Sequence, residues 1–338
     1  MDGLTVVTGG AGFIGTHLVK ELVDSGQQVR VLEKPGTAVD RLPTAVELVF
    51  ADIRDRGSLI RAFDGARWVY HLAANPNLWV RDRREFDAVN HRGTVNVLDA
   101  ALDAGASRVL HTSTESILTR PAQSGPIDEN VEISLSDAVG PYCRSKLLAE
   151  KYALSLAAAG RPVVVANPTM PVGPGDRNLS PPTRLVLDFC RGNLPAIMAC
   201  TLNLIDVRDV AHGLTLVMAR GRPGQRYILG NENLTLEAMM IILSELSGMP
   251  VPALRVPYAL ALSYAWLSEL WADQVTGHSP KATVTGVRLG KRIMHFDSSR
   301  TDAELGLRKR PIRESLCNLV DWLRETGLLA CHVAKPAS

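Results

Sequence analysis

The stretch Thr8-Gly9-Gly10-Ala11-Gly12-Phe13-Ile14-Gly15 follows a short apolar run, Leu4–Thr8, and precedes a helical pattern over Thr16–Ser25. Glycines at these spacings permit a tight turn, let the backbone approach a pyrophosphate and place its charge at a helix N-terminus. A glycine-rich turn alone is a weak signal. Here a strand precedes it, a helix follows it and an acid, Glu33, ends the next apolar run, so the stretch predicts a dinucleotide site.

Further apolar runs alternate with helical patterns through the first half of the chain. The runs are short and rich in β-branched residues, as expected of strands buried on both faces of a sheet: Val29–Glu33, Val46–Ala51, Trp68–Leu72, Arg108–Thr112 and Val163–Ala166. Helical patterns lie between them at Ser58–Phe63, Val89–Ala104 and Pro141–Ala159. This alternation predicts an α/β fold with a Rossmann-type, doubly wound parallel sheet and helices on both faces.

The composition changes after about Asn167, where prolines and glycines mark a loop-rich departure from the sheet. Beyond it, Leu204–Asp206 and Tyr227–Leu229 resemble short strands, whereas Leu236–Ser247 and Pro257–Trp271 resemble helices. We expect a dinucleotide-binding domain over 1–168, to which 201–232 returns. A smaller, discontinuous C-terminal substrate lobe would comprise 169–200 and 233–330, followed by a tail over 331–338.

The overall composition is that of an ordinary globular protein. The 338 residues carry a formal net charge of +2, which gives no electrostatic case for a nucleic-acid partner. The chain enters its first predicted strand almost at once, so we expect no signal peptide. The odd number of cysteines and the absence of a CxxC pair indicate free thiols and a cytoplasmic location; the cysteines are Cys143, Cys190, Cys200, Cys317 and Cys331. The scattered histidines indicate no metal site.

The segment Val256–Val275 is the most apolar of the chain, interrupted by Ser263, Ser268, Glu269 and Asp273. An all-round apolar helix is usually buried, so we expect a helix in the core of the second lobe. Two alternatives stay open: the helix lines an apolar substrate pocket, or it makes a peripheral contact with a membrane surface.

Two neighbouring side chains bear on the choice of nicotinamide cofactor. Glu33 can accept hydrogen bonds from a ribose hydroxyl and would repel a 2′-phosphate, which favours NAD. Lys34 could instead pair with that phosphate, so NADP stays open.

Tyr142-Cys143-Arg144-Ser145-Lys146 opens a predicted helix, which places Tyr142 and Lys146 one turn apart on one face. A tyrosine ordinarily titrates near pKa ~10, and a nearby ammonium favours its phenolate. Tyr142 could then act as a general acid/base on a substrate oxygen. The hydroxyl-rich strand end His111-Thr112-Ser113-Thr114 could align that oxygen with Tyr142.

These motifs, together with several others in the same order, resemble the extended short-chain dehydrogenase/reductases of the NAD-dependent epimerase/dehydratase family. The others are Asp52-Ile53, His71-Leu72-Ala73-Ala74, and Asn90 with the tract from Gly93 to Leu98. The tracts NPTMPVGPGD, LNLIDVRDVAHG and RYILGNENLTL are also similar to hopanoid-associated sugar epimerases, which in turn resemble dihydroflavonol reductases and 3β-hydroxysteroid dehydrogenases.

The resemblance implies a role for each matching residue. Gly9, Gly12, Phe13, Ile14 and Gly15 would hold the pyrophosphate, Asp52 and Ile53 would flank the adenine, and Leu72, Ala73 and Ala74 would line the cofactor path. Asn90 would lie beneath the nicotinamide ribose, and Ala166, Asn167 and Pro168 beside the nicotinamide, with Asn167 also facing substrate. Thr114 (or Ser113, if the register is shifted by one), Tyr142 and Lys146 would form the catalytic triad, and Lys146 would also bind the nicotinamide ribose.

Three functions remain open. The first is an NAD(P)-dependent oxidoreductase that interconverts a secondary alcohol and a ketone on a bulky, apolar, sterol- or terpenoid-like substrate. In many sugar-nucleotide enzymes of the family an Arg-Asp pair stands where this chain has Leu202-Asn203, and dehydratases carry Asp-Glu in place of Glu115-Ser116. The second is a sugar-nucleotide epimerase with bound NAD, whose diphosphate could meet Arg288/Lys291/Arg292 or Arg308/Lys309/Arg310. The third is a non-catalytic sensor, which the intact triad disfavours. The family also favours a homodimer formed through two long helices.

Overall fold

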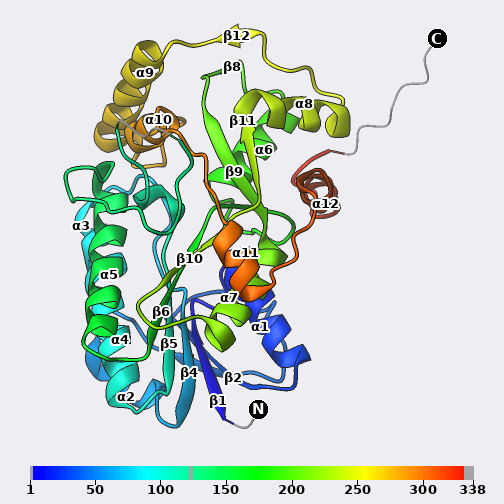
Figure 1. Cartoon of the computed structure of the whole chain (residues 1–338). Coiled ribbons are helices and arrows are strands. Elements are labelled where there is room, and N and C mark those ends of the chain that lie inside the picture. Colours follow the sequence, from blue (N-terminus) through cyan, green and yellow to red (C-terminus); the bar gives the residue numbers. More distant parts are fainter. Residues whose placement is uncertain (1–2, 122–124, 331–338) are drawn as a thin grey trace.

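A sheet of seven parallel strands forms the centre of the computed structural model, which describes residues 3–121 and 125–330 (Figure 1). The strand order is β10-β6-β5-β4-β1-β2-β3. The strands are β1 (Leu4–Thr8), β2 (Gln28–Glu33), β3 (Glu47–Phe50), β4 (Ala66–His71), β5 (Arg108–Thr112), β6 (Val163–Pro168) and β10 (Arg226–Leu229). The prediction of a doubly wound parallel sheet is confirmed.

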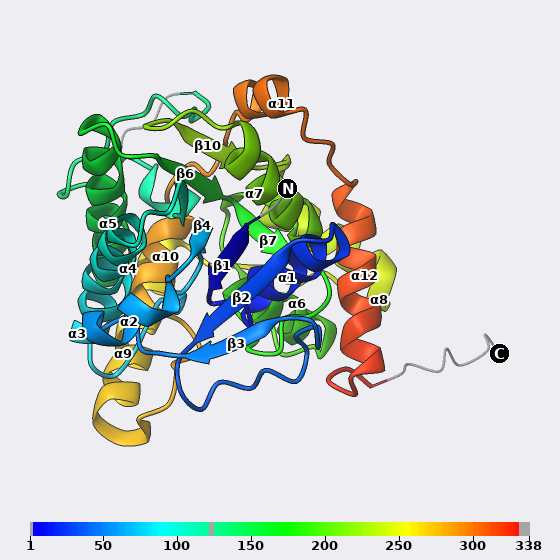
Figure 2. The same ribbon diagram turned by 90° about the horizontal axis from the view of Figure 1, so that it is seen from below.

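Helices cover both faces of this sheet because its strands are apolar on both sides. In β1, Val6 and Val7 are both fully buried and point to opposite faces. Val7 packs with α1 (Phe13–Asp24) and α7 (Val207–Arg220). Val6 packs on the side of α2 (Arg56–Ala62), α4 (Thr94–Asp103) and α5 (Gly140–Ala158). Figure 2 shows the two helix layers with the sheet between them.

The strand order reverses at β1. The chain runs from β1 to β2 and β3 on one side, then crosses to β4, β5 and β6 on the other. Such a switch point leaves a crevice at the carboxyl ends of the strands, where ligands bind in open α/β sheets. The glycine stretch lies at that edge. Short helical elements follow two strands beyond the crossing. After β4 come α3 (Arg84–Phe86) and the π-helix η1 (Asp87–Gly93), and after β5 comes the 3-10 helix η2 (Glu115–Ile117).

A second region with its own core lies beyond β6. It contains a three-stranded sheet of β7 (Met170–Val172), β9 (Thr201–Asp206) and β11 (Glu232–Thr235), and a two-stranded one of β8 (Ala196–Ile197) and β12 (Leu254–Arg255). Helices α6 (Pro181–Cys190), α8 (Leu236–Ser247) and α12 (Ile312–Glu325) pack with β7 and β9. The expected strands and helix at 204–206, 227–229 and 236–247 are confirmed, whereas β7, β8, β11 and β12 were missed because each has only two to four residues.

The helix predicted within Val256–Val275 exists but is not buried. It comprises α9 (Tyr258–Trp271) and the π-helix η3 (Ala272–Thr276), followed by α10 (Val284–Gly290) and α11 (Ser299–Leu305). Only Ala265 of α9 is buried, and Trp266 and Leu267 are each 62% exposed. The expectation of a core helix is therefore wrong, because the apolar side chains of α9 face outward. Across 3–121 and 125–330, none of the helices has the combination of length and apolarity needed to cross a membrane.

The cysteines within the described residues carry no disulfide. Cys143, Cys190, Cys200 and Cys317 are free thiols, as predicted. Cys331 and the expected tail over 331–338 lie outside the described residues.

Candidate active site

The glycine stretch forms the turn between β1 and α1, and its packing leaves no room for side chains. Gly9 has φ +74°, and a Cβ there would lie 2.7 Å from the amide nitrogen of Ala73. A Cβ on Gly15 would lie 2.1 Å from the carbonyl oxygen of Gly9. Gly12 precedes the first residue of α1, Phe13, and has no side chain that could cap the helix. The first amides of α1 are therefore available to an anion.

Glu33, at the end of β2, stabilises this turn. Its carboxylate accepts a hydrogen bond of 2.7 Å from the backbone amide of Ala11. Burial raises the pKa of Glu33, and the bond from Ala11 opposes that rise. The neighbouring Lys34 is exposed. The structure thus places the acid against the turn and the lysine in solvent.

The other predicted cofactor residues border the same crevice. Leu72 and Ala73 donate their amides to the carbonyl and hydroxyl oxygens of Thr8, at 3.1 Å and 3.3 Å, which fixes the segment Leu72–Ala74 beside the glycine turn. Ile53 is buried against Gly93. Asp52 is bound to Arg54, whose hydrogen bonds lower the pKa of that carboxyl.

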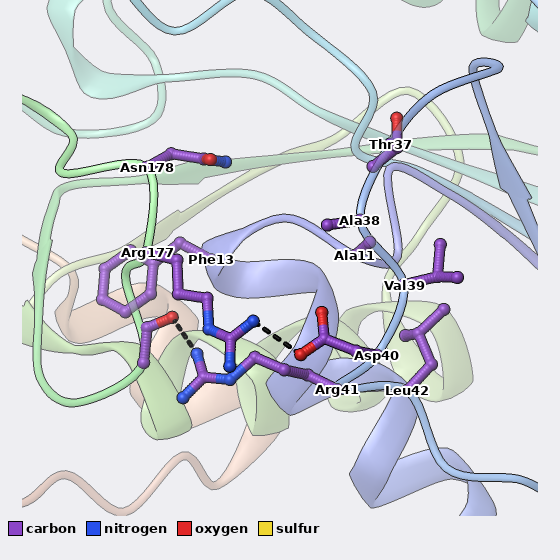
Figure 3. Close-up of a pocket in the computed structure, with 11 residues that line it drawn as sticks. Ala11, Phe13, Thr37, Ala38, Val39, Asp40, Arg41, Leu42, Arg177 and Asn178 are labelled. Carbon is purple, nitrogen blue, oxygen red and sulfur yellow. Dashed lines mark hydrogen bonds and ion pairs between the residues drawn. The ribbon is translucent and has the colours of Figure 1, made fainter. Parts of the chain in front are cut away.

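A small pocket of about 80 Å³ opens between the glycine turn and the loop after β2 (Figure 3). Its lining includes Ala11 and Phe13, residues 37–42, and Arg177 and Asn178. Arg177 pairs with Asp40 at 2.6 Å, whereas Arg41 donates to the carbonyl oxygen of Gly175 at 2.7 Å. The guanidinium of Arg41 has no carboxylate partner among the described residues and lies at the same pocket as the N-terminus of α1. A positively charged side chain beside a helix N-terminus is an environment suited to a phosphate.

Asn90 connects the cofactor side of the site to the catalytic helix. It is fully buried in the π-helix η1, and its side chain bonds to the backbone of Asn75 at 2.7 Å and 3.1 Å and to the hydroxyl of Ser145 at 3.3 Å. Its partner Asn75 was not identified from the sequence. The π-turn itself, a feature frequent at functional sites, has no sequence signature here.

Tyr142 lies in the first turn of α5, next to the residues that follow β5. The hydroxyls of Thr114 and Ser116 form hydrogen bonds with the phenol, and the ring of Phe86 contacts it edge-on at 6.1 Å. Burial raises the pKa of Tyr142 above its usual value, and these hydrogen bonds oppose the rise. The structure thus brings Thr114 to Tyr142 together with Ser116, which had not been assigned a role.

Lys146 lies one turn along the same helix and is fully enclosed. Its ammonium donates to the carbonyl oxygen of Thr112 at 2.8 Å. Desolvation lowers the pKa of Lys146 to about 8, while the charge of Glu150 opposes that decrease. The rings of His71 and His111 stack at 5.6 Å beneath this region, and burial lowers the pKa of both, so both are neutral at pH 7.

Glu150 anchors three elements from inside the molecule. The buried carboxylate pairs with Arg226 of β10 at 2.7 Å and accepts a hydrogen bond of 2.7 Å from the side chain of Asn167 in β6. Neither Glu150 nor Asn167 is exposed. Glu150 was missed from the sequence, although it lies one helical turn after Lys146 on the same face of α5.

Replacing Glu150 by glutamine is expected to lower the free energy of unfolding by about 3 kcal/mol or more, since it leaves Arg226 partly buried without a counter-ion. Urea denaturation measures this change. Glu237→Gln is the matched control, because its pair with Arg255 is exposed (55% and 42%), and should cost less than about 1 kcal/mol. Equal losses in the two variants would contradict a structural role for the buried pair.

Glu115 is a second carboxyl that had no assigned role. It accepts a hydrogen bond of 3.0 Å from Thr114, and burial raises its pKa from 4.5 to about 7. The native state therefore binds this proton more tightly than the unfolded chain does. The resulting stabilisation is complete below about pH 4.5 and is lost as the pH rises through about 7.

Glu115→Gln does not titrate and should therefore gain stability relative to the wild type between pH 4.5 and 8, by about 1 to 2 kcal/mol after allowance for partial exposure. Urea denaturation across this pH range measures the difference. Glu132→Gln, at an exposed position, is the control and should change the free energy of unfolding by less than about 0.5 kcal/mol. A constant difference between Glu115→Gln and wild type at every pH would refute the titration.

A dinucleotide fits these residues. The glycine turn is shaped so closely that a Cβ on Gly9 or Gly15 would collide with backbone. At the carboxyl ends of β5 and β6, the hydroxyl of Ser113 and the amide oxygen of Asn167 are buried without a hydrogen-bond partner among the described residues. Buried polar atoms normally have partners, so these atoms suit a polar ligand at this edge of the sheet.

Comparisons with known proteins agree with this geometry. The model of the NAD-dependent epimerase/dehydratase family matches residues 5–230. A provisionally named dihydroflavonol 4-reductase of Synechocystis sp. is 36% identical over 95% of this chain and 94% of its own length. Sterol demethylase protein B of Methylococcus capsulatus is 33% identical over 96% and 99%. The crystal structure of gox2253 superposes with a TM-score of 0.86, at 32% identity over 97% of this chain and 100% of that one.

Proposed function

Because the chain belongs to the NAD-dependent epimerase/dehydratase family, we propose that it is an oxidoreductase that interconverts a secondary alcohol and a ketone on a bulky, largely apolar substrate. The observation that carries this proposal is the convergence of Thr114, Tyr142 and Lys146 at the carboxyl end of β5. We assign the catalytic roles to these three residues. NAD is the cofactor. We propose that the site also accepts NADP, whose 2′-phosphate would meet the exposed Lys34.

The proposed reaction places proton transfer on Tyr142. In the direction of reduction its phenol donates the proton to the carbonyl oxygen, and in the direction of oxidation its phenolate accepts the proton of the alcohol. When the substrate binds, the hydroxyl of Thr114 turns from Glu115, donates its hydrogen bond to the same oxygen and holds it beside the phenol. A dinucleotide whose pyrophosphate is held at the glycine turn would supply or accept the hydride at the adjacent carbon through its nicotinamide.

Lys146 stabilises the deprotonated, phenolate form of Tyr142 in this proposal. With burial alone, the phenol of Tyr142 keeps its proton at neutral pH. An ammonium in an enclosed site favours the phenolate, because opposite charges attract more strongly where water is excluded. Lys146 remains protonated at pH 7, since its pKa is about 8.

The surroundings of Tyr142 support an apolar substrate. Its ring belongs to a cluster of buried side chains from distant segments, including Phe86, Ile117, Leu118, Val139, Leu289 and Met294. The apolar surroundings of the site therefore come from this cluster. They do not come from Val256–Val275, whose apolar side chains face outward. An apolar environment around Tyr142 favours a sterol or terpenoid ketone over a polar sugar.

Two observations disfavour a sugar nucleotide. At the position of the Arg-Asp pair, Leu202 packs into the second core and Asn203 bonds to Asn233 at 2.8 Å. One candidate diphosphate cluster is already engaged, because Lys309 pairs with Asp302 at 2.5 Å and Arg310 pairs with Asp209. These cations serve internal ion pairs.

A substrate panel tests the proposal. Sterol and triterpenoid ketones and alcohols are compared with UDP- and dTDP-sugars, with each nicotinamide cofactor, by cofactor absorbance and product analysis. We expect net cofactor turnover with an apolar ketone or alcohol. Epimerised sugar without net turnover would establish the alternative, an epimerase with bound NAD.

We also propose that the protein is cytoplasmic and forms a homodimer through α4 and α5. Sedimentation velocity tests the size of this assembly.

A further inference from the structure

In helix α9 and the following η3, acidic and polar side chains face the protein and large apolar side chains face the solvent. Along the helix, the less exposed positions recur at helical spacing and include Ser268, Glu269 and Asp273. The opposite face is apolar and exposed, between 44% and 64% for each residue. We call it the α9 face; it comprises Leu260, Tyr264, Trp266, Leu267, Leu270, Trp271 and Val275. A surface helix ordinarily has the reverse arrangement.

The inward acids hold the helix in this orientation. Arg83 lies 3.5 Å from the carboxylate of Glu269 and 3.1 Å from that of Asp273. Asp273 also accepts from the indole of Trp79 at 3.1 Å, and Glu269 accepts from the amide of Val284 at 2.8 Å. Rotating the apolar residues inward would break all four contacts. The exposure of the α9 face is therefore built into the fold.

Basic side chains border the α9 face. Lys291 lies with its ammonium 4.5 Å from the ring centre of Tyr258, at the start of α9, and Arg81 lies beside Gly277, at the end of η3. Lys281 and Arg288 are exposed in the segment that follows. Within 3–121 and 125–330, none of these four cations has a carboxylate at ion-pair distance. The two acids of α9 and η3 both point inward. The border of the face is therefore positively charged.

We propose that the α9 face is a docking surface for an anionic lipid bilayer, on which the protein binds peripherally. Tryptophan, tyrosine and leucine are the side chains that enter the boundary between headgroups and acyl chains. Unpaired lysines and arginines at the border meet the anionic headgroups. An exposed apolar patch bordered by polar residues marks an interaction site.

The charges favour a lipid surface over a second copy of the chain. Self-association through a two-fold axis would bring the same face of two molecules together. The cations that border one face would then meet those of the other, with no carboxylate of α9 or η3 facing outward to compensate. An anionic headgroup layer instead presents the complementary charge over the whole border.

The docking surface adjoins the catalytic helix. α10 packs against α9, and its Thr285 lies where a Cβ on Gly140, two residues before Tyr142, would collide. Leu289 of α10 belongs to the same apolar cluster as Tyr142. In both views α9 lies at the edge of the molecule (Figures 1 and 2). If the substrate is apolar, as proposed above, docking would bring the active site close to the layer in which that substrate dissolves; this step alone rests on the proposed function.

Vesicle co-sedimentation tests the docking surface. Wild-type protein should bind vesicles of phosphatidylcholine mixed with phosphatidylglycerol, more weakly at high salt, and should bind phosphatidylcholine alone less well. Trp266→Glu combined with Leu270→Glu should weaken binding at least about tenfold. Replacing Arg288 and Lys291 by alanine should weaken binding to the anionic vesicles by about fivefold for each side chain.

Ile60→Glu is the matched control, because Ile60 is 64% exposed on α2, at the opposite end of the molecule, and its change should leave binding intact (Figure 1). An unchanged thermal midpoint in each variant shows that the fold is kept. The proposal fails if the wild type does not bind the mixed vesicles, binds phosphatidylcholine alone as tightly, or binds no better than the Trp266/Leu270 variant. It also fails if the wild type forms a dimer that this variant converts to a monomer. Vesicle binding by a protein that reduces no ketone would refute the proposed reaction and leave the docking surface standing.

Discussion

The variant Tyr142→Phe should lose between about 10²- and 10⁴-fold in kcat, because it removes the only group that we assign to proton transfer at the substrate oxygen. The aromatic ring, its contact with Phe86 and the packing of α5 are retained. Cofactor affinity should therefore change little. Steady-state kinetics on the preferred ketone, with a separate titration of NADH binding, measures both quantities.

Tyr152→Phe is the control within the same helix. Its hydroxyl donates to Asp99 at 2.5 Å, away from Thr114 and Lys146, so its loss should leave kcat within about twofold of wild type. Full activity in Tyr142→Phe would refute our assignment. A wild-type protein that binds NAD, turns over no substrate and keeps its cellular role in the Tyr142→Phe form would support a sensor instead.

The variant Gly15→Ala should lose at least about a hundredfold in NAD affinity, equivalent to about 2.7 kcal/mol. The added Cβ would lie 2.1 Å from the carbonyl oxygen of Gly9 and 2.8 Å from the Cα of Gly10. Both contacts are with backbone, so the turn itself must move, and the first amides of α1 move with it. Isothermal titration with NAD measures the loss.

Gly57→Ala is the matched control, since the nearest atom to its Cβ is a side-chain oxygen of Asp55 at 3.3 Å, which can move. It lies in the first turn of α2, outside the glycine turn, and should leave NAD affinity unchanged. Wild-type NAD affinity in Gly15→Ala would mean that the pyrophosphate does not bind at the glycine turn.

The central sheet was predictable because its signals are local. Each strand of the first half is a continuous apolar run, and the glycine turn marks the crossing from β1 to α1. The placement of Tyr142 and Lys146 on one face of a helix was predictable for the same reason, because it depends only on their spacing in the sequence. The assignment of Thr114 to the same site as Tyr142 depended on the resemblance to the family, because β5 ends at Thr112 and α5 begins only at Gly140.

The orientation of α9 could not be predicted, because the partners that fix it are distant in sequence. Arg83 and Trp79 lie about 190 residues before Asp273. Composition alone suggested burial, since apolar helices are usually internal. The positions of Ser268, Glu269 and Asp273 on a single stripe were the available signal, and they mark the inward face.

The pair Glu150–Arg226 escaped prediction for the same reason. Arg226 follows Glu150 by 76 residues and reaches it only because β10 pairs with β6. Glu115 was visible in the sequence as a departure from the dehydratase pattern, but its burial and its bond to Thr114 depend on the 3-10 turn η2. Side-chain networks of this kind arise from the packing of distant segments.

Transfer of deuterium from the cofactor tests the central claim most directly. The protein is incubated with a sterol or triterpenoid ketone and NADH that carries deuterium at the transferable position of the nicotinamide ring, and the product is analysed by mass spectrometry and NMR. Our account predicts an alcohol that carries the deuterium on its carbinol carbon, formed in equal amount to the cofactor oxidised and abolished by Tyr142→Phe. Products without deuterium at that carbon, or label retained in the cofactor while a sugar nucleotide is epimerised, would contradict it.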